Sequence, residues 1–376
     1  MNKSRLVQVL SSLLWLTGCA STSLQTRSEP LSSDQRHRSI LAFNRGIASL
    51  QKKDADYYEA VNHFKKAVRI NPGFYQAHYN LGLLYSRGND FKNAEEAYQK
   101  AIQSRPKDRA ANFNLAQVYL RQDKFEPAIQ ILESFIESNP TDHQARNNLV
   151  VLLRKQKDYH KAVDQARYVL DREPGQVLAY NNLATIFSEE KRHEMAEDLF
   201  RRALTLDPDN SLVLNNLGLA KLKNNDIQQA LELFLKSFKK QSKLTEAGMN
   251  AASVYMKSGD YVNAAKVYKK IARATPGFLP ALVGHAVAMR CLGQYEKAEK
   301  SYQQILGLDH TNPQAMFNLG ILYMKFREKP QWACQAFSKF LKAGRATPVE
   351  KKRAQEYLEE LRLQHPKSCK INKEKP

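Results

Sequence analysis

The sequence is poor in the residue types that build catalytic and metal sites. It has four cysteines in 376 residues, Cys19, Cys291, Cys334 and Cys369, and their spacing matches no metal-binding motif. The nine histidines are scattered, and the chain has no HExxH motif, no GxSxG motif and no glycine-rich phosphate loop. The sequence therefore predicts no enzyme, no metal site and no cofactor.

An apolar run long enough to span a bilayer, about 20 residues, is also absent from the N-terminal region. The run there extends only from Leu6 to Leu16, and it follows Lys3 and Arg5 without an acidic residue. This layout is typical of a secretory signal peptide, which we place at residues 1–18. The run ends in Leu16-Thr17-Gly18-Cys19, where an ordinary signal peptide would have a small residue in place of the thiol.

This motif resembles the lipobox of bacterial lipoproteins. The resemblance implies transfer of a diacylglyceryl group to Cys19, cleavage before it and acylation of the freed amine. Ala20 follows Cys19, where aspartate would imply retention in the inner membrane, so the resemblance implies an outer-membrane anchor with the chain facing the periplasm. The alternative is a non-lipidated signal peptide with an incidental cysteine. Residues 20–38 are polar and predict a flexible tether.

Acidic residues are scarce relative to basic ones. The chain has 38 Asp+Glu against 58 Lys+Arg, and loss of residues 1–18 would lower its formal net charge from +20 to about +18. In a compartment outside the cytosol this charge argues against nucleic acid as a partner. It favours anionic lipid, an anionic cell-wall polymer or acidic protein surfaces.

A 34-residue period dominates the rest of the chain. Taking Tyr75 as position one, the register repeats at residues 109, 143, 177, 211, 245, 279 and 313. Position twenty is alanine in seven consecutive copies, position eight is small or aliphatic in all, and proline closes most units. The alanines are Ala94, Ala128, Ala162, Ala196, Ala230, Ala264 and Ala298.

This pattern resembles the tetratricopeptide repeat, a helix-turn-helix unit of 34 residues. The resemblance implies an all-α fold, a right-handed superhelical solenoid of about nine repeats over residues 39–345. Two copies carry insertions, which we expect in the turn between the paired helices. An amphipathic stretch, residues 346–364, predicts a capping helix for the last apolar face, and residues 365–376 form a basic tail.

Polar side chains recur at two positions of the first helix of each repeat. Position six is about 160° around the helix from position eight, so if position eight faces the packing seam, position six faces the open groove. Seven of eight copies have asparagine there: Asn80, Asn114, Asn148, Asn182, Asn216, Asn250 and Asn318. Position thirteen, on the same stripe, is basic in six copies: Arg87, Arg121, Lys155, Lys223, Lys257 and Lys325.

These residues suit an extended and partly acidic segment of a partner protein. An amide offers a donor and an acceptor to a peptide backbone, and the cations attract carboxylates. Some peptide-binding members of the repeat family use such an asparagine ladder. The alternative is that asparagine before Leu-Gly is a habit of the repeat and the cations form an ordinary solvated surface.

Two of the remaining cysteines lie near the C-terminus. We expect Cys334 on the last repeat and Cys369 after the final helix to be able to pair as a disulfide, because the chain turns back after Pro366. Cys291 would then remain a single thiol.

The function that the sequence favours is a lipid-anchored scaffold that holds partner segments in a bacterial envelope machine. The chain resembles pilotins of the type IV pilus secretin and repeat lipoproteins of gliding-motility complexes, the latter through Trp332–Gly344 and the helix after it. The alternatives are an activator of cell-wall synthases or hydrolases and a non-lipidated periplasmic chaperone.

Overall fold

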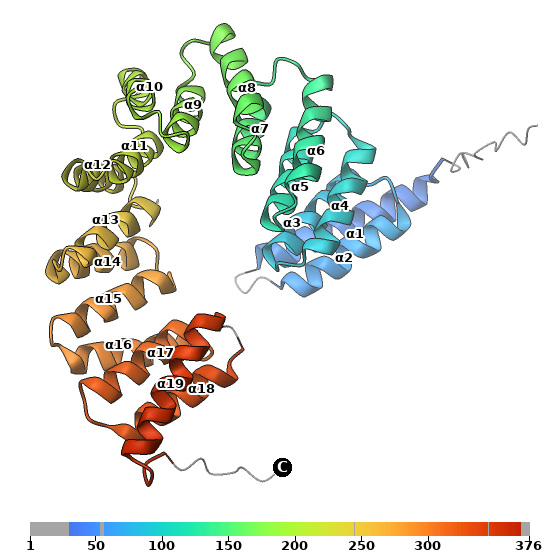
Figure 1. Ribbon diagram of the computed structural model, residues 1–376. Helices are drawn as coiled ribbons and strands as arrows, with labels where there is room; N and C mark the ends of the chain where they lie inside the picture. The colour runs from blue at the N-terminus through green and yellow to red at the C-terminus, as the bar shows by residue number, and fades with distance from the viewer. Residues whose placement is uncertain (1–29, 53–55, 244, 345, 370–376) are drawn as a thin grey trace, which may run out of the picture. The chain divides into compact units, whose positions relative to one another are not determined.

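The structure is a computed structural model that describes residues 30–52, 56–243, 245–344 and 346–369 (Figure 1). Within these residues the regular secondary structure consists of 19 α-helices and no strands. None of the helices described there has both the length and the apolar character needed to cross a bilayer. The predicted signal peptide, Cys19 and most of the basic tail lie outside the described residues.

The chain divides into two units, before and after the Pro106–Lys107 boundary. The helices of the first unit are α1 (Ser33–Gln51), α2 (Tyr57–Ile70), α3 (Tyr75–Arg87) and α4 (Phe91–Ser104). Those of the second unit are α5 (Arg109–Arg121), α6 (Phe125–Ser138), α7 (His143–Gln156), α8 (Tyr159–Arg172), α9 (Val177–Glu189), α10 (His193–Leu206), α11 (Ser211–Lys223), α12 (Ile227–Lys240), α13 (Thr245–Lys257), α14 (Tyr261–Ala274), α15 (Leu279–Cys291), α16 (Tyr295–Leu308), α17 (Pro313–Lys325), α18 (Pro330–Lys342) and α19 (Pro348–Gln364).

Helices α1 to α18 pair as nine hairpins, and seven of the nine share one turn geometry. The residue at position fifteen has a left-handed φ in each: Asn89, Asp123, Lys157, Lys191, Asn225, Gly259 and Gly293. This conformation reverses the chain within three residues. In four of the seven the next residue is an aspartate whose side chain caps the second helix; Asp226, for example, accepts a hydrogen bond from the backbone N–H of Gln229.

Each hairpin is closed by residues of complementary size at positions eight and twenty-four. Gly218 faces Phe234, and a Cβ added to this glycine would lie 2.7 Å from the phenylalanine ring. Where position eight is larger, as at Val150, position twenty-four is reduced to Ala166, and both are fully buried. The two helices can approach closely only because each large side chain meets a small one.

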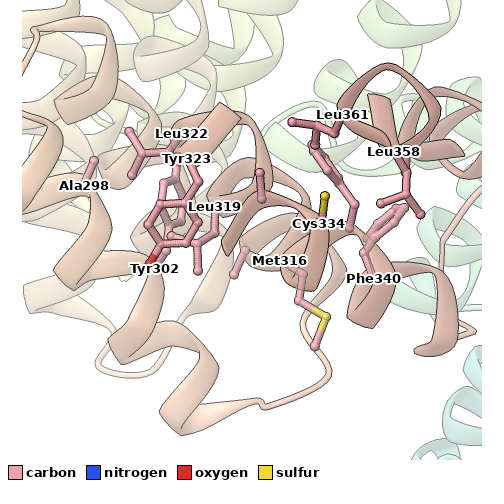
Figure 2. Close-up of a cluster of buried hydrophobic side chains, with 14 of the residues drawn as sticks. Ala298, Tyr302, Met316, Leu319, Leu322, Tyr323, Cys334, Phe340, Leu358 and Leu361 are labelled. Atoms are coloured by element: carbon pink, nitrogen blue, oxygen red, sulfur yellow. The ribbon is translucent and has the colours of Figure 1, made fainter. Parts of the chain in front are cut away.

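Helix α19 covers the last repeat, as the sequence predicts for a capping helix. Leu358 and Leu361 belong to the same buried cluster as Phe340 of α18 and Leu319 of α17 (Figure 2). Thr347 caps α19 in a capping box with Glu350, which explains the helix start at Pro348. The predicted all-α solenoid of nine hairpins with a final capping helix is confirmed.

A disulfide joins Cys334 of α18 to Cys369, with the two Cα atoms 5.6 Å apart. These are the two cysteines expected to be able to pair, and both are buried. The bond ties the segment after α19 to the last repeat, so the end of the solenoid is closed by a covalent link as well as by packing. Cys291 is a free thiol with an exposed position.

Candidate binding surface on the first helices

The first helices of neighbouring hairpins contact one another in the second unit. Such contacts join α5 to α7, α7 to α9, α9 to α11 and α15 to α17, and they are more extensive than any between second helices. We call the side formed by the first helices the inner face and the side formed by the second helices the outer face. In the first unit, α1 and α2 form one hairpin of the same kind, and α3 and α4 form another.

The asparagines at position six are partly or largely buried in the first helices. Six of the seven are half-buried, and Asn182 is only 9% exposed. Asn182, Asn216 and Asn250 bond to the preceding repeat, so at these three copies position six lies at the seam between first helices, contrary to the expectation. A helical wheel places a residue relative to its own hairpin only and does not include the neighbouring repeat.

Three of these asparagines donate hydrogen bonds to asparagines of the preceding repeat. The side-chain nitrogen of Asn216 lies 3.0 Å from Asn181 Oδ1, and that of Asn250 lies 2.9 Å from Asn215 Oδ1. These bonds connect α9 to α11 and α11 to α13, and the acceptors are buried, so each bond fixes one repeat against the next.

The same pairing connects α7 to α9. Asn182 Nδ2 lies 3.3 Å from the backbone oxygen of Asn147 and 3.4 Å from its side-chain oxygen. We call the three pairs, Asn147–Asn182, Asn181–Asn216 and Asn215–Asn250, the asparagine seam. The members at position five were not predicted, although Asn-Asn pairs occur in three consecutive repeats and only there is position five an asparagine.

The other asparagines at position six behave differently. Asn80 and Asn318 donate to carbonyl oxygens of their own helices, those of Gln76 and Gln314, at 2.8 Å in each case. Asn148 borders a cavity of about 250 Å³ between α5, α6 and α7, with Gln117 beside it and apolar side chains at its base. Those side chains are Phe113, Leu120, Leu132, Val151 and Leu152.

The six basic residues predicted at position thirteen are all exposed. In the second unit they are Arg121, Lys155, Lys223, Lys257 and Lys325. The acidic exception at this position, Glu189, forms an ion pair with Arg154 of the preceding repeat, at 2.5 Å between Nη1 and Oε1. Because this carboxylate is matched by a cation, the ends of the first helices carry a net positive charge.

One copy lacks the asparagine altogether, and the structure gives the reason. In the eighth repeat position six is Gly284, and a Cβ there would lie 2.5 Å from the ring of Tyr268 on α14. Tyr268 is buried, and its ring lies against the backbone of α15 at Gly284. An asparagine at this place would overlap the ring.

Together, the stacked hairpins and their shared turns define a helical-repeat solenoid, a class of protein that presents an extended surface to its partners. Sequence profiles described as tetratricopeptide repeat match residues 45–109, 87–149, 177–210 and 199–232. The chain is a tetratricopeptide-repeat protein, and arrays of this repeat are scaffolds for protein–protein interaction that bind peptide segments of their partners.

Solved structures share this fold at low identity. Yeast Tom70 is 14% identical over 87% of this chain and 96% of its own, with a TM-score of 0.43. PilF of Pseudomonas aeruginosa is 18% identical over 57% of this chain and 96% of its own, with a TM-score of 0.46. PilW, a type IV pilus biogenesis factor, is 19% identical over 57% and 98%, also with a TM-score of 0.46. No curated protein matches the sequence significantly.

Proposed function

We propose that this protein is a membrane-tethered scaffold of a bacterial envelope machine, of the motility or type IV pilus and secretin assembly type. Its inner face captures extended, partly acidic segments of partner proteins. The tether after Cys19 holds the solenoid at the periplasmic side of the outer membrane. The resemblance of Leu16–Cys19 to a lipobox and the choice of Ala20 support the anchor and its location.

The observation that carries the inner-face proposal is the cavity beside Asn148. It has an apolar base of a size suited to one side chain of a bound segment, while Asn148 and Gln117 stand at its edge with amide donors and acceptors. Arg121 and Lys155 extend from the same two first helices and are exposed. An apolar residue next to carboxylates would satisfy all three features.

Charge reversal tests the inner face without disturbing the packing. Lys155→Glu combined with Lys257→Glu changes two exposed side chains, so the helicity measured by circular dichroism should not change. Capture of envelope partners by crosslinking should fall about 10-fold or more, since several attractive contacts become repulsive. The matched control, Lys239→Glu with Lys352→Glu, alters two exposed lysines on α12 and α19. Equal capture by both double variants would contradict the proposal.

The lipid anchor has its own test. Cys19→Ala removes the thiol that would accept the diacylglyceryl group, so labelling with a palmitate analogue should be lost and the precursor should stay uncleaved or mislocalised. Label that persists in this variant would overturn the lipoprotein assignment and leave a periplasmic chaperone as the better account.

The strong basic charge supports a second candidate, an activator that positions cell-wall synthases or hydrolases against an anionic cell-wall polymer. The two functions differ in what copurifies with the chain after crosslinking in the envelope. Machine subunits support the scaffold, and a cell-wall enzyme supports the activator.

A further inference from the structure

A second cavity lies on the opposite side of the solenoid, in the eighth repeat. It has a volume of about 450 Å³ and lies between α14, α15 and α16, so the second helices of two neighbouring hairpins form its walls. Leu282, Ile305 and Leu308 supply apolar surface, and His285, Gln304 and Lys269 supply polar groups. A shallower hollow continues from it past Met289 to Lys297 and Lys300.

The residue at position seven of this repeat borders the cavity, and it differs from the residue that most copies have there. Six copies have leucine there, and all six are buried: Leu81, Leu115, Leu149, Leu183, Leu217 and Leu319. The seventh repeat has Ala251 there, which is fully buried. In the eighth repeat the residue is His285, which is only half-buried and borders both hollows. Position seven is enclosed within the hairpin in the six repeats with leucine, whereas in the eighth repeat it is open to the outer face.

The walls of the cavity carry positive charge only. Lys269 lines the cavity and Lys297 and Lys300 line the hollow beside it, and no acidic residue is among the described residues that line either one. Lys269 and Lys300 are exposed and take part in none of the ion pairs found within the described parts of the chain. Burial, and secondly the charge of Lys269, lowers the pKa of His285, so the imidazole is neutral at pH 7 and can donate and accept hydrogen bonds.

The apolar floor also reaches the surface. Leu308, at the end of α16, is 67% exposed, whereas Ile305 one turn before it is 1% exposed. The cavity therefore offers a path from solvent to a buried apolar wall, and its volume falls within the range of about 300 to 1,000 Å³ that is usual for ligand sites.

We propose that this cavity is a second binding site, for an acidic segment of a partner protein that inserts one apolar side chain between α14 and α16. The inserted side chain would contact Leu282 and Ile305, and carboxylates beside it would bind the lysines at the rim. The site is independent of the inner face and goes beyond the function proposed for it. A chain with sites on both faces can hold two partners at once.

The substitution His285→Leu tests the site with little risk to the fold, because leucine is the residue at this place in six other repeats. A randomised eight-residue phage library would be panned on the full wild-type chain after depletion on the His285→Leu variant. We expect the enriched peptides to have an apolar residue flanked by aspartate or glutamate. A synthetic peptide of that sequence should bind the wild type at least about 10-fold more tightly than the variant.

Two double variants separate the outer site from the inner face. Lys297→Gln with Lys300→Gln should weaken the same peptide by about 10-fold, since two charge-assisted contacts are lost. Lys223→Gln with Lys257→Gln makes the same change in charge on the inner face and should leave its affinity within about twofold. If charge reversal at Lys155 and Lys257 left partner capture unchanged, the inner-face proposal would fail, but the peptide test of the outer cavity would still stand.

Three results would overturn the proposal: no peptide that distinguishes the wild type from His285→Leu, enriched peptides without acidic residues, or equal loss of binding in the inner-face control. Circular dichroism and thermal unfolding of every variant establish that binding is compared between folded chains.

Discussion

The fourth to sixth repeats and the eighth repeat solve the same packing problem in different ways. In the former, Leu149, Leu183 and Leu217 fill the hairpins and the asparagine seam joins the first helices. The eighth repeat has Gly284 and His285 in place of the asparagine and the leucine; it takes no part in the seam, and His285 borders a cavity.

Both regions keep the contacts that close a hairpin. In the eighth repeat Ala286, Ala298 and Tyr302 are fully buried, as their equivalents are in the sixth repeat, Ala230 and Phe234. The comparison shows that positions eight, twenty and twenty-four close the hairpin in both regions. Positions six and seven are then free to serve either as a rigid seam or as an opening for a ligand.

The largest effect should come from making the sixth repeat resemble the eighth. Leu217→His removes a buried aliphatic side chain and places a polar ring without a partner between α11 and α12, so we expect a loss of about 2 to 4 kcal/mol in the free energy of unfolding. Urea unfolding followed by circular dichroism measures it. A loss below about 1 kcal/mol would mean that position seven does not determine packing in these repeats.

The asparagine seam can be broken separately. Asn216→Ala leaves the buried side-chain oxygen of Asn181 without its donor, which should cost about 1 to 3 kcal/mol. The matched control is Asn318→Ala, because Asn318 donates only within α17 in a hydrogen bond exposed to solvent. That control should change the stability by about 0.5 kcal/mol or less. Equal losses in the two variants would show that the bonds between repeats add nothing.

The reverse change should make the eighth repeat resemble its neighbours. His285→Leu replaces a half-buried imidazole with an apolar side chain of similar size, and we expect a gain of about 0.5 to 2 kcal/mol in the free energy of unfolding. The measurement is the same urea titration. A destabilised variant would indicate that His285 contributes to packing and does not merely border an opening.

The smallest expected effect depends on pH. Burial lowers the pKa of His285 below its ordinary value, so the unfolded chain binds more protons and the folded state loses stability as pH falls below about 6.5. His285→Leu removes this loss. Burial also lowers the pKa of His78, but that residue is present in both the wild type and the variant, so its contribution cancels in the difference. The stability difference between variant and wild type should thus grow from pH 7.5 to about pH 5.5. A difference that stays constant over this range would contradict a lowered pKa of His285.

The features that the sequence predicts correctly are those that recur with the period. The hairpins, their number and the capping helix follow from positions eight and twenty and from the amphipathic pattern after residue 346. The left-handed turns were not predicted, because Lys157 and Lys191 occupy them where glycine would be the usual signal.

The surface could be predicted only in part. The cations at position thirteen are exposed as expected, since they end a first helix and face solvent. The asparagine seam depends on contacts between position six of one repeat and position five of the preceding one, which a helical wheel of a single helix does not contain. The outer cavity depends in turn on how the side chains of three helices fill space around one histidine.

The most direct test of the inner-face account is photocrosslinking in native envelope membranes. A photoreactive amino acid is placed at Lys223 on the inner face or, as the control, at Lys239 on the outer face of the same repeat. The account predicts adducts with partner proteins from position 223 that are absent from position 239 and disappear when Lys155→Glu and Lys257→Glu are added. Identical adducts from both positions, or adducts from position 239 alone, would contradict it.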